Sequence, residues 1–294
     1  MGAVKTLRHI AASGILAGCL IPLASYGRGP ASSESLDSSS HDAAALFSRT
    51  ASQTLARDFS SPNISYLFYD ARDDRFIAAK WSESGQAIPI GSLVKPFTAL
   101  AYAESHSFHF PEHVCMGGNS CWLPKGHGAL SIVGAIAFSC NSYFTELAAN
   151  IGGLQVTLVA RRFGLNGPGA GASPVAMAGR FGMWRESPES LVRAYAMLLG
   201  RRSQPAIRNI VDGMAESARV GTAAGLGRQG LHQSFLAKTG TAPCTHAEHA
   251  PGDGLVIVAW PADLPRYLLL VRQHGVPGAQ ASALAGRMLR TLEP

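Results

Sequence analysis

The spacing of apolar residues divides the chain into three blocks, and the first block predicts a helix followed by two strands. Apolar residues recur at helical spacing over Ala43–Phe59. Two short runs rich in aromatic and aliphatic residues follow, Ile64–Tyr69 and Arg75–Trp81. The polar segment 70–74 separates these runs, so we expect them to pair as a β-hairpin.

The middle block, from Ser92 to about residue 210, has helical spacing throughout. Glycines stand just past several of its apolar runs, where a residue with positive φ ends a helix at low cost. The helices predicted in this block are Ser92–Glu104, Ile132–Ser139, Ser142–Asn150, Leu154–Phe163, Glu189–Leu199 and Ala206–Ala218.

The last block returns to strands and ends with a helix. Its predicted strands are Ser234–Thr241, Leu255–Trp260 and Arg266–Arg272, and its helix is Ala279–Leu292. Strands from both ends of the chain must share one sheet if their edges are to be paired. The sequence therefore predicts an α+β fold: a mainly antiparallel five-stranded sheet flanked by N- and C-terminal helices, with an all-helical lobe inserted between strands 2 and 3. A cleft is expected where lobe and sheet meet.

The N-terminus has the pattern of a leader, which predicts export to the periplasm or the outer face of a bacterial envelope. Residues 1–9 carry positive charge and no acid, and an apolar stretch too short for a membrane span follows. Two processing routes remain open: the segment 16–19 (LAGC) resembles a lipobox, which would place a lipid on Cys19, and cleavage near residues 25–27 is the alternative. We expect a leader over 1–27, a Ser-rich linker over 28–42 and one domain over 43–294.

Composition excludes some classes of protein. The 294 residues, 47% of them apolar, suffice for a sizeable core, and the formal charge is +6. No basic run interleaved with aromatic residues is present, so we do not expect nucleic acid as a partner. Excess positive charge suits anionic surfaces or carboxylate substrates, but a solubilising surface charge is the favoured interpretation.

Beyond the leader the chain has four cysteines, Cys115, Cys121, Cys140 and Cys244. Cys115 and Cys121 flank a turn at 117–119 and are predicted to form a disulfide in an oxidising compartment. The alternative is a zinc site. Candidate histidines are His109, His113 and His127 around the first pair, and His246 and His249 beside Cys244. Neither group has paired C-x-x-C spacing, so a disulfide or free thiols are favoured, and no metal or cofactor is expected.

Three short motifs carry candidate chemistry, and the first is Ser92-Leu93-Val94-Lys95. Residues three apart on a helix share a face, so the lysine can contact the serine hydroxyl. A serine becomes a useful nucleophile when a base takes its proton, and a lysine serves once burial lowers its pKa. An N-cap serine with a surface lysine is the alternative interpretation.

The second motif, Ser139-Cys140-Asn141, falls between two predicted helices, where side chains open into a cleft. The third, Lys238-Thr239-Gly240 with Thr241 behind it, lies in a predicted strand. Gly240 weakens a strand interior and is typical of close approach by a ligand or another backbone. A cation and two hydroxyls beside it suit a carboxylate. For the third motif, a surface lysine with a glycine at the end of a strand is the alternative interpretation.

The order S-x-x-K, S-x-N, K-T-G resembles that of penicillin-binding proteins and serine β-lactamases. Gly126-His127-Gly128 ahead of the second motif is similar to the class B penicillin-binding proteins, and the resemblance covers roughly residues 43–292. It implies a D,D-transpeptidase or D,D-carboxypeptidase acting on peptidoglycan stem peptides and acylated by β-lactams. A serine β-lactamase and a binding module or sensor without turnover are the alternative functions.

The resemblance also implies a role for each matching residue. Ser92 would be the acylated nucleophile, Lys95 its base and Ser139 the proton relay, while Asn141 would bind the substrate backbone. The substrate carboxylate would be held by Lys238, Thr239 and Thr241, and the oxyanion by the backbone N–H groups of Ser92 and Thr241. Protein partners and oligomeric state do not follow from these residues.

Overall fold

The computed structural model describes residues 34–244 and 252–293, with side chains from Ala44 onward. The chain divides into two units, Met1–Ala43 and Ala44–Pro294. Of the first unit, residues 34–43 are described, and they form the beginning of helix α1 (Glu34–Asp58). The predicted leader, with Cys19, lies outside the described residues.

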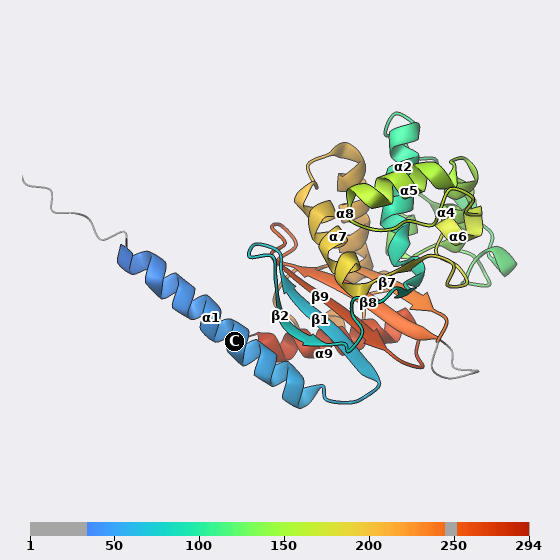
Figure 1. Cartoon of the computed structure of the whole chain (residues 1–294). Coiled ribbons are helices and arrows are strands. Elements are labelled where there is room, and N and C mark those ends of the chain that lie inside the picture. The colour runs from blue at the N-terminus through green and yellow to red at the C-terminus, as the bar shows by residue number, and fades with distance from the viewer. Residues whose placement is uncertain (1–33, 245–251, 294) are drawn as a thin grey trace, which may run out of the picture. The chain divides into compact units, whose positions relative to one another are not determined.

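The second unit is built on a five-stranded antiparallel sheet in the order β2-β1-β9-β8-β7. Strands from the two ends of the chain share it, as predicted, with β1 paired to β9 (Figure 1). Its strands are β1 (Ile64–Asp70), β2 (Arg75–Lys80), β7 (Leu236–Ala242), β8 (Asp253–Trp260) and β9 (Tyr267–Gln273).

Alternating residues give the sheet two apolar faces. In β8, Leu255 and Ile257 point into a core shared with the helical lobe, while Val256 and Val258 point into a second core. The second core includes Leu55 of α1 and residues of the C-terminal helix α9 (Gly278–Leu292). Because both faces are covered, β8 is apolar and buried along nearly its whole length.

The lobe between β2 and β7 consists of helices around α2, whose residues 95–101 are all buried. Helix α2 packs against α4, α5 and α8. The helices are α2 (Lys95–Ser105), α3 (Ile132–Ala137), α4 (Asn141–Ala149), α5 (Gly153–Arg162), α6 (Pro174–Met177), α7 (Pro188–Gly200) and α8 (Pro205–Arg219), with short 3-10 turns η1 (Gly91–Val94), η2 (Gly118–Ser120) and η3 (Gly227–Gln229). The predicted fold class is therefore confirmed.

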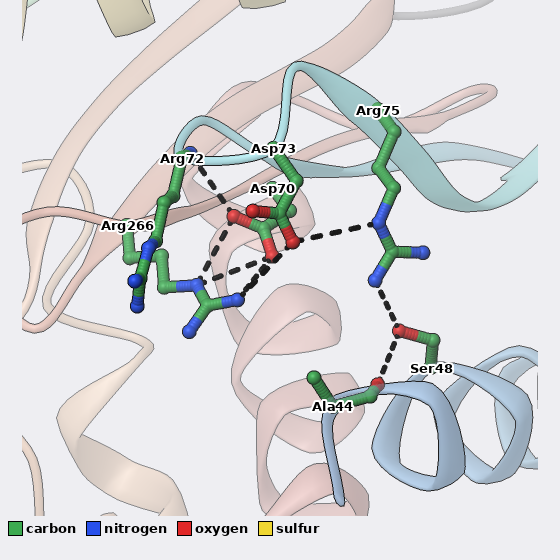
Figure 2. Close-up of polar contacts among 7 residues, drawn as sticks. All are labelled: Ala44, Ser48, Asp70, Arg72, Asp73, Arg75 and Arg266. Carbon is green, nitrogen blue, oxygen red and sulfur yellow. Dashed lines mark hydrogen bonds and ion pairs between the residues drawn. The ribbon is translucent and has the colours of Figure 1, made fainter. Parts of the chain in front are cut away.

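An ion pair holds the β1–β2 hairpin to the residue before β9, and a separate hydrogen bond holds it to α1 (Figure 2). The Arg266 guanidinium donates to both carboxylate oxygens of Asp70, at 3.1 and 2.7 Å. Burial alone would raise the pKa of Asp70, but this ion pair and the Arg72 N–H outweigh it and hold the pKa below its usual value. On the hairpin's other side, Arg75 donates to Ser48 Oγ at 2.8 Å.

Three local features differ from the sequence-based expectations. Helix α1 begins at Glu34, inside the predicted linker, because adding residues to an existing helix costs little. Ser92 lies in the 3-10 turn η1 and does not cap a helix, because Pro96 lacks an N–H and α2 begins only at Lys95. Two small two-stranded sheets were not expected: β3 (Ile88–Pro89) with β6 (Arg185–Glu186), and β4 (His113–Cys115) with β5 (Gly128–Leu130).

Over residues 34–244 and 252–293, no helix is both long and apolar enough to cross a membrane.

Candidate active site

Two glycines allow the turn that carries Ser92 to lie against β7. Gly91 has φ +55°, and a Cβ built on it would lie 2.3 Å from the carbonyl oxygen of Thr241. A Cβ on Gly240 would lie 2.8 Å from the carbonyl oxygen of Ile90. Both positions therefore need glycine so that the turn carrying Ser92 can lie on the strand. The close backbone approach predicted at Gly240 is confirmed, and the other backbone is that of the turn.

Lys95 is fully buried, and its Nζ is bound to the second motif. It donates to Ser139 O at 2.7 Å, to Asn141 Oδ1 at 2.7 Å and to Ser139 Oγ at 3.3 Å. Burial lowers the pKa of Lys95 to about 7, outweighing opposing charge effects from Cys140 and Cys121. A large fraction of Lys95 is therefore neutral near neutral pH and able to accept a proton.

Ser139 occupies a strained position at the end of α3. Its φ is +52°, a left-handed conformation that usually selects glycine. The Ser139 N–H donates to Ile136 O, and the Cys140 N–H donates to Ala135 O, which is the Schellman pattern of helix termination. The turn aims the Ser139 hydroxyl at both buried lysines. Backbone strain of this kind clusters at functional sites.

Lys238 approaches the same hydroxyl from the sheet. Its Nζ donates to Ser139 Oγ at 2.8 Å and to Thr239 O at 2.8 Å. Burial, and then the nearby charge of Lys95, hold the pKa of Lys238 well below its usual value. Thr239 donates its hydroxyl to Thr222 Oγ1 at 2.6 Å, and Thr241 Oγ1 accepts from the N–H of Gly278 at 3.0 Å.

These groups open into a cavity of about 550 Å³ between the lobe and β7. Residues of all three motifs line it: Ser92, Ser139, Asn141, Thr239, Gly240 and Thr241. The structure thus brings together all eight predicted site residues, with Lys95 and Lys238 buried behind the cavity wall. Among the described residues, no side chain hydrogen-bonds the Ser92 hydroxyl; Lys95 is bound to Ser139 and Asn141 instead.

Sequence reasoning missed several residues of this cavity. Trp122, Arg180, Phe181 and Thr222 line it beside the three motifs. Trp122 and Phe181 are 51% and 68% exposed, unusual for large aromatic side chains and typical of a surface that binds a ligand. They come from loops without a recognisable motif, so apolar spacing alone gave no signal for them.

Three glutamates of the lobe have partners away from the cavity. Glu186 is buried and accepts from the backbone N–H groups of Asn166 and Gly167, at 2.9 and 2.8 Å. Glu146 pairs with His113 at 2.6 Å, and Glu189 accepts from the Ser84 hydroxyl. These carboxylates stabilise loops and helix ends, which limits their use as bases for a water molecule.

The predicted disulfide between Cys115 and Cys121 is not formed in the structure, where both are free thiols. Their sulfur atoms lie 3.6 and 3.5 Å from His127 Nδ1, and Cys121 Sγ lies 3.8 Å from Cys140 Sγ. The paired strands β4 and β5 bring His127 next to Cys115, and the turn after α3 brings in Cys140. Four side chains that could hold a metal ion are thus grouped: Cys115, Cys121 and His127, which the sequence named as candidate zinc ligands, and Cys140, which it did not.

The fold is that of the transpeptidase domains of penicillin-binding proteins. PBP2 of Pseudomonas aeruginosa, solved in complex with WCK 5153, is similar with a TM-score of 0.67 and 17% identity, over 84% of this chain and 73% of that one. The transpeptidase domain of the FtsI4 D,D-transpeptidase from Legionella pneumophila has a TM-score of 0.60 and 19% identity, over 84% and 94%.

PBP2 from Helicobacter pylori, in a complex with MreC, has a TM-score of 0.67 and 16% identity. The alignment covers 84% of this chain and 62% of that one, so this chain spans less than two thirds of that protein. No family model and no curated protein sequence matches the chain.

Proposed function

We propose that this chain is a serine acyl-transferase that acts on D-Ala-D-Ala-type stem peptides of peptidoglycan, as a D,D-transpeptidase or D,D-carboxypeptidase, and that β-lactams acylate it. The observation that carries the proposal is the buried network behind Ser92. Two lysines with lowered pKa values converge on one strained serine hydroxyl beside the cavity. Perturbed pKa values beside a cavity are typical of catalytic sites.

In the proposed first step, neutral Lys95 takes the proton from the Ser92 hydroxyl. The Ser92 oxygen then bonds to the carbonyl carbon of the penultimate residue of the peptide. The backbone N–H groups of Ser92 and Thr241 stabilise the resulting oxyanion, because they are already oriented before charge develops. Support comes from the contact of Gly91 with the Thr241 backbone, which places these two segments side by side.

Collapse of the tetrahedral intermediate breaks the peptide bond and releases D-alanine. Its amine needs a proton, which Ser139 passes on from Lys95 through the hydroxyl between the two lysines. The acyl group on Ser92 then passes to an amine of a second peptide or to water. Lys95 acts as the base in this second step, because its proton has been lost to the first leaving group.

The remaining motif residues are proposed to orient the substrate. Lys238, Thr239 and Thr241 are proposed to bind the terminal carboxylate, and the Asn141 amide to bind the peptide backbone. The engaged glutamates favour this activity over that of a β-lactamase, which must supply a base to hydrolyse its acyl-enzyme quickly. The substrate is extracytoplasmic, so export through the N-terminal leader belongs to the same proposal.

Fluorescent penicillin labelling tests this function. We expect the wild-type protein to be labelled on the peptide that contains Ser92, and Ser92→Ala to remain unlabelled. Lys95→Met should lose labelling about as completely, because nucleophile and base act as a unit. Lys125→Met, at an exposed lysine, is the matched control and should be labelled normally. Equal labelling of wild type and Ser92→Ala would refute the proposal.

A further inference from the structure

Behind the second motif lies a compact group of four side chains, Cys115, Cys121, His127 and Cys140. Their donor atoms, three sulfurs and His127 Nδ1, all lie within 4.8 Å of one another. The three cysteines are buried. They come from three separate segments, namely β4, the loop after η2 and the start of α4.

The spacing of these atoms fits a tetrahedral zinc ion. With Zn–S bonds of about 2.3 Å and Zn–N bonds of about 2.0–2.1 Å, tetrahedral geometry separates two sulfurs by about 3.8 Å and a sulfur from a nitrogen by about 3.5 Å. The observed Cys121–Cys140 separation is 3.8 Å, and the two sulfur–nitrogen separations are 3.5 and 3.6 Å. Three thiolates and one imidazole are a soft donor set that suits zinc and excludes calcium and magnesium.

The surrounding backbone supports thiolate ligands. The N–H of Tyr143 donates to Cys140 Sγ at 3.5 Å. Donors of this kind stabilise metal-bound sulfur and orient it.

Two glycines allow the loop beside these four side chains to fold tightly. A Cβ on Gly117 would lie 2.2 Å from Pro124 O, and one on Gly126 would lie 2.2 Å from Cys115 O. Both have φ +77°, a conformation that favours glycine. The loop backbone is therefore folded tightly enough to hold Cys115, Cys121 and His127 in fixed relative positions.

We propose that these four side chains form a Cys₃His zinc site, and that the bound ion fixes the turn that carries Ser139 and Asn141. Cys140 stands between those two residues and caps α4, so a bond from its sulfur to the ion would restrain both neighbours. Binding releases the thiol protons to solvent and involves no redox change. The metal site stands on its own geometry, whereas the effect on Ser139 and Asn141 rests on the proposed function.

The first test is metal content and cobalt substitution in the purified full-length chain. We expect about one equivalent of zinc per chain and, after exchange with Co²⁺, the intense d–d absorption of tetrahedral cobalt with a thiolate-to-cobalt charge-transfer band. Cys121→Ser should lose most of the bound metal. Cys244→Ser, the same substitution at a cysteine of the separate group Cys244, Asp253 and His274, should keep the thiolate–cobalt band of the Cys₃His site. Reduced wild-type protein that gives no thiolate–cobalt band would overturn the site, whether or not the variants fold.

The second test addresses positioning. Chelation of the wild-type protein should slow acylation by fluorescent penicillin by about tenfold, and added zinc should restore it, since changes in such supporting groups cost about 10- to 100-fold. An unchanged acylation rate after the cobalt band has been lost would refute the positioning role. A protein that shows the cobalt band but is never labelled would refute the proposed function and leave the metal site intact.

Discussion

Lys95 and Lys238 share one hydrogen-bond partner, the hydroxyl of Ser139, at 3.3 and 2.8 Å. One lysine comes from the helical lobe and the other from the sheet, and both side chains are fully buried. Burial lowers the pKa values of both lysines, and the nearby charge of Lys95 lowers that of Lys238 further. The shared hydroxyl can accept from one lysine while it donates to the other, which makes it a path for a proton.

The first prediction concerns pH. Because burial lowers the pKa of Lys95 to about 7, its neutral form increases as pH rises through that value. The second-order rate constant for acylation should therefore rise with pH, reach a plateau above about pH 8, and fall about tenfold per pH unit well below 7. Stopped-flow labelling with a fluorescent penicillin measures it, with far-UV circular dichroism at each pH to verify folding. A flat profile over this range would show that Lys95 is not the base.

The second prediction separates carboxylate recognition from general activity. Lys238→Met keeps most of the unbranched side chain and removes its hydrogen-bonding amine. Acylation by a penicillin with a free carboxylate should fall roughly ten- to a hundredfold, because a hydrogen bond to a charged group contributes about 1.5–3 kcal/mol. Acylation by the methyl ester of the same penicillin should change much less.

An equal loss for the free acid and the ester would contradict carboxylate binding by Lys238. It would indicate that Lys238 acts instead through the buried network, where it hydrogen-bonds to Ser139 and lies near the charge of Lys95. Lys125→Met serves as the control for loss of a lysine, because Lys125 is exposed.

Much of this arrangement could be predicted from the sequence, for reasons specific to each element. The β1–β2 hairpin and the strands β7–β9 followed from apolar runs between clear turns. The convergence of Ser92, Ser139 and Lys238 required the resemblance to a known family, since 47 and 99 residues separate them and apolar spacing does not relate distant segments. The strained conformation of Ser139 had no local signal, because a serine before an N-cap cysteine looks like any loop serine.

Cys140 makes a contact that the sequence did not predict. The resemblance implies roles for its neighbours Ser139 and Asn141 and none for Cys140 itself. Its contact with Cys121 depends on the packing of α4 against the β4–β5 loop, which sequence spacing does not reveal. Helix α1 begins nine residues earlier than the apolar pattern indicated. Polar residues can extend a helix that apolar residues further along stabilise, so apolar spacing does not show where such a helix begins.

The third prediction concerns the turn before Ser92. Gly91→Ala should lower the free energy of unfolding by at least about 2 kcal/mol, because it combines a positive φ with a steric clash. The added Cβ would lie 2.3 Å from Thr241 O. Gly85→Ala is the matched control: a Cβ there meets nothing within 4 Å, so its effect should stay within about 0.5 kcal/mol. Urea denaturation of both variants measures the difference, and equal stabilities would contradict the contact.

The last prediction concerns the lifetime of the acyl-enzyme. A β-lactamase needs a base that activates water against the ester on its serine. In the lobe, Glu186 is tied to the N–H groups of Asn166 and Gly167, Glu146 to His113 and Glu189 to Ser84. Freeing any of them would leave its partners without a hydrogen bond, at a cost of about 1–3 kcal/mol for each buried group.

We therefore expect penicillin to bind covalently in about a one-to-one ratio and to be released slowly, while a stem-peptide mimic ending in D-Ala-D-Ala yields free D-alanine over many turnovers. The two substrates differ because a peptide loses its leaving group from the cavity after acylation, whereas the opened β-lactam stays attached and shields the ester from water or an amine. Intact-protein mass spectrometry over time measures the adduct, and an enzymatic D-alanine assay measures turnover. Ser92→Ala is the control for both. Rapid catalytic hydrolysis of nitrocefin by the wild-type protein would show that a deacylating base is present and that the chain acts as a β-lactamase.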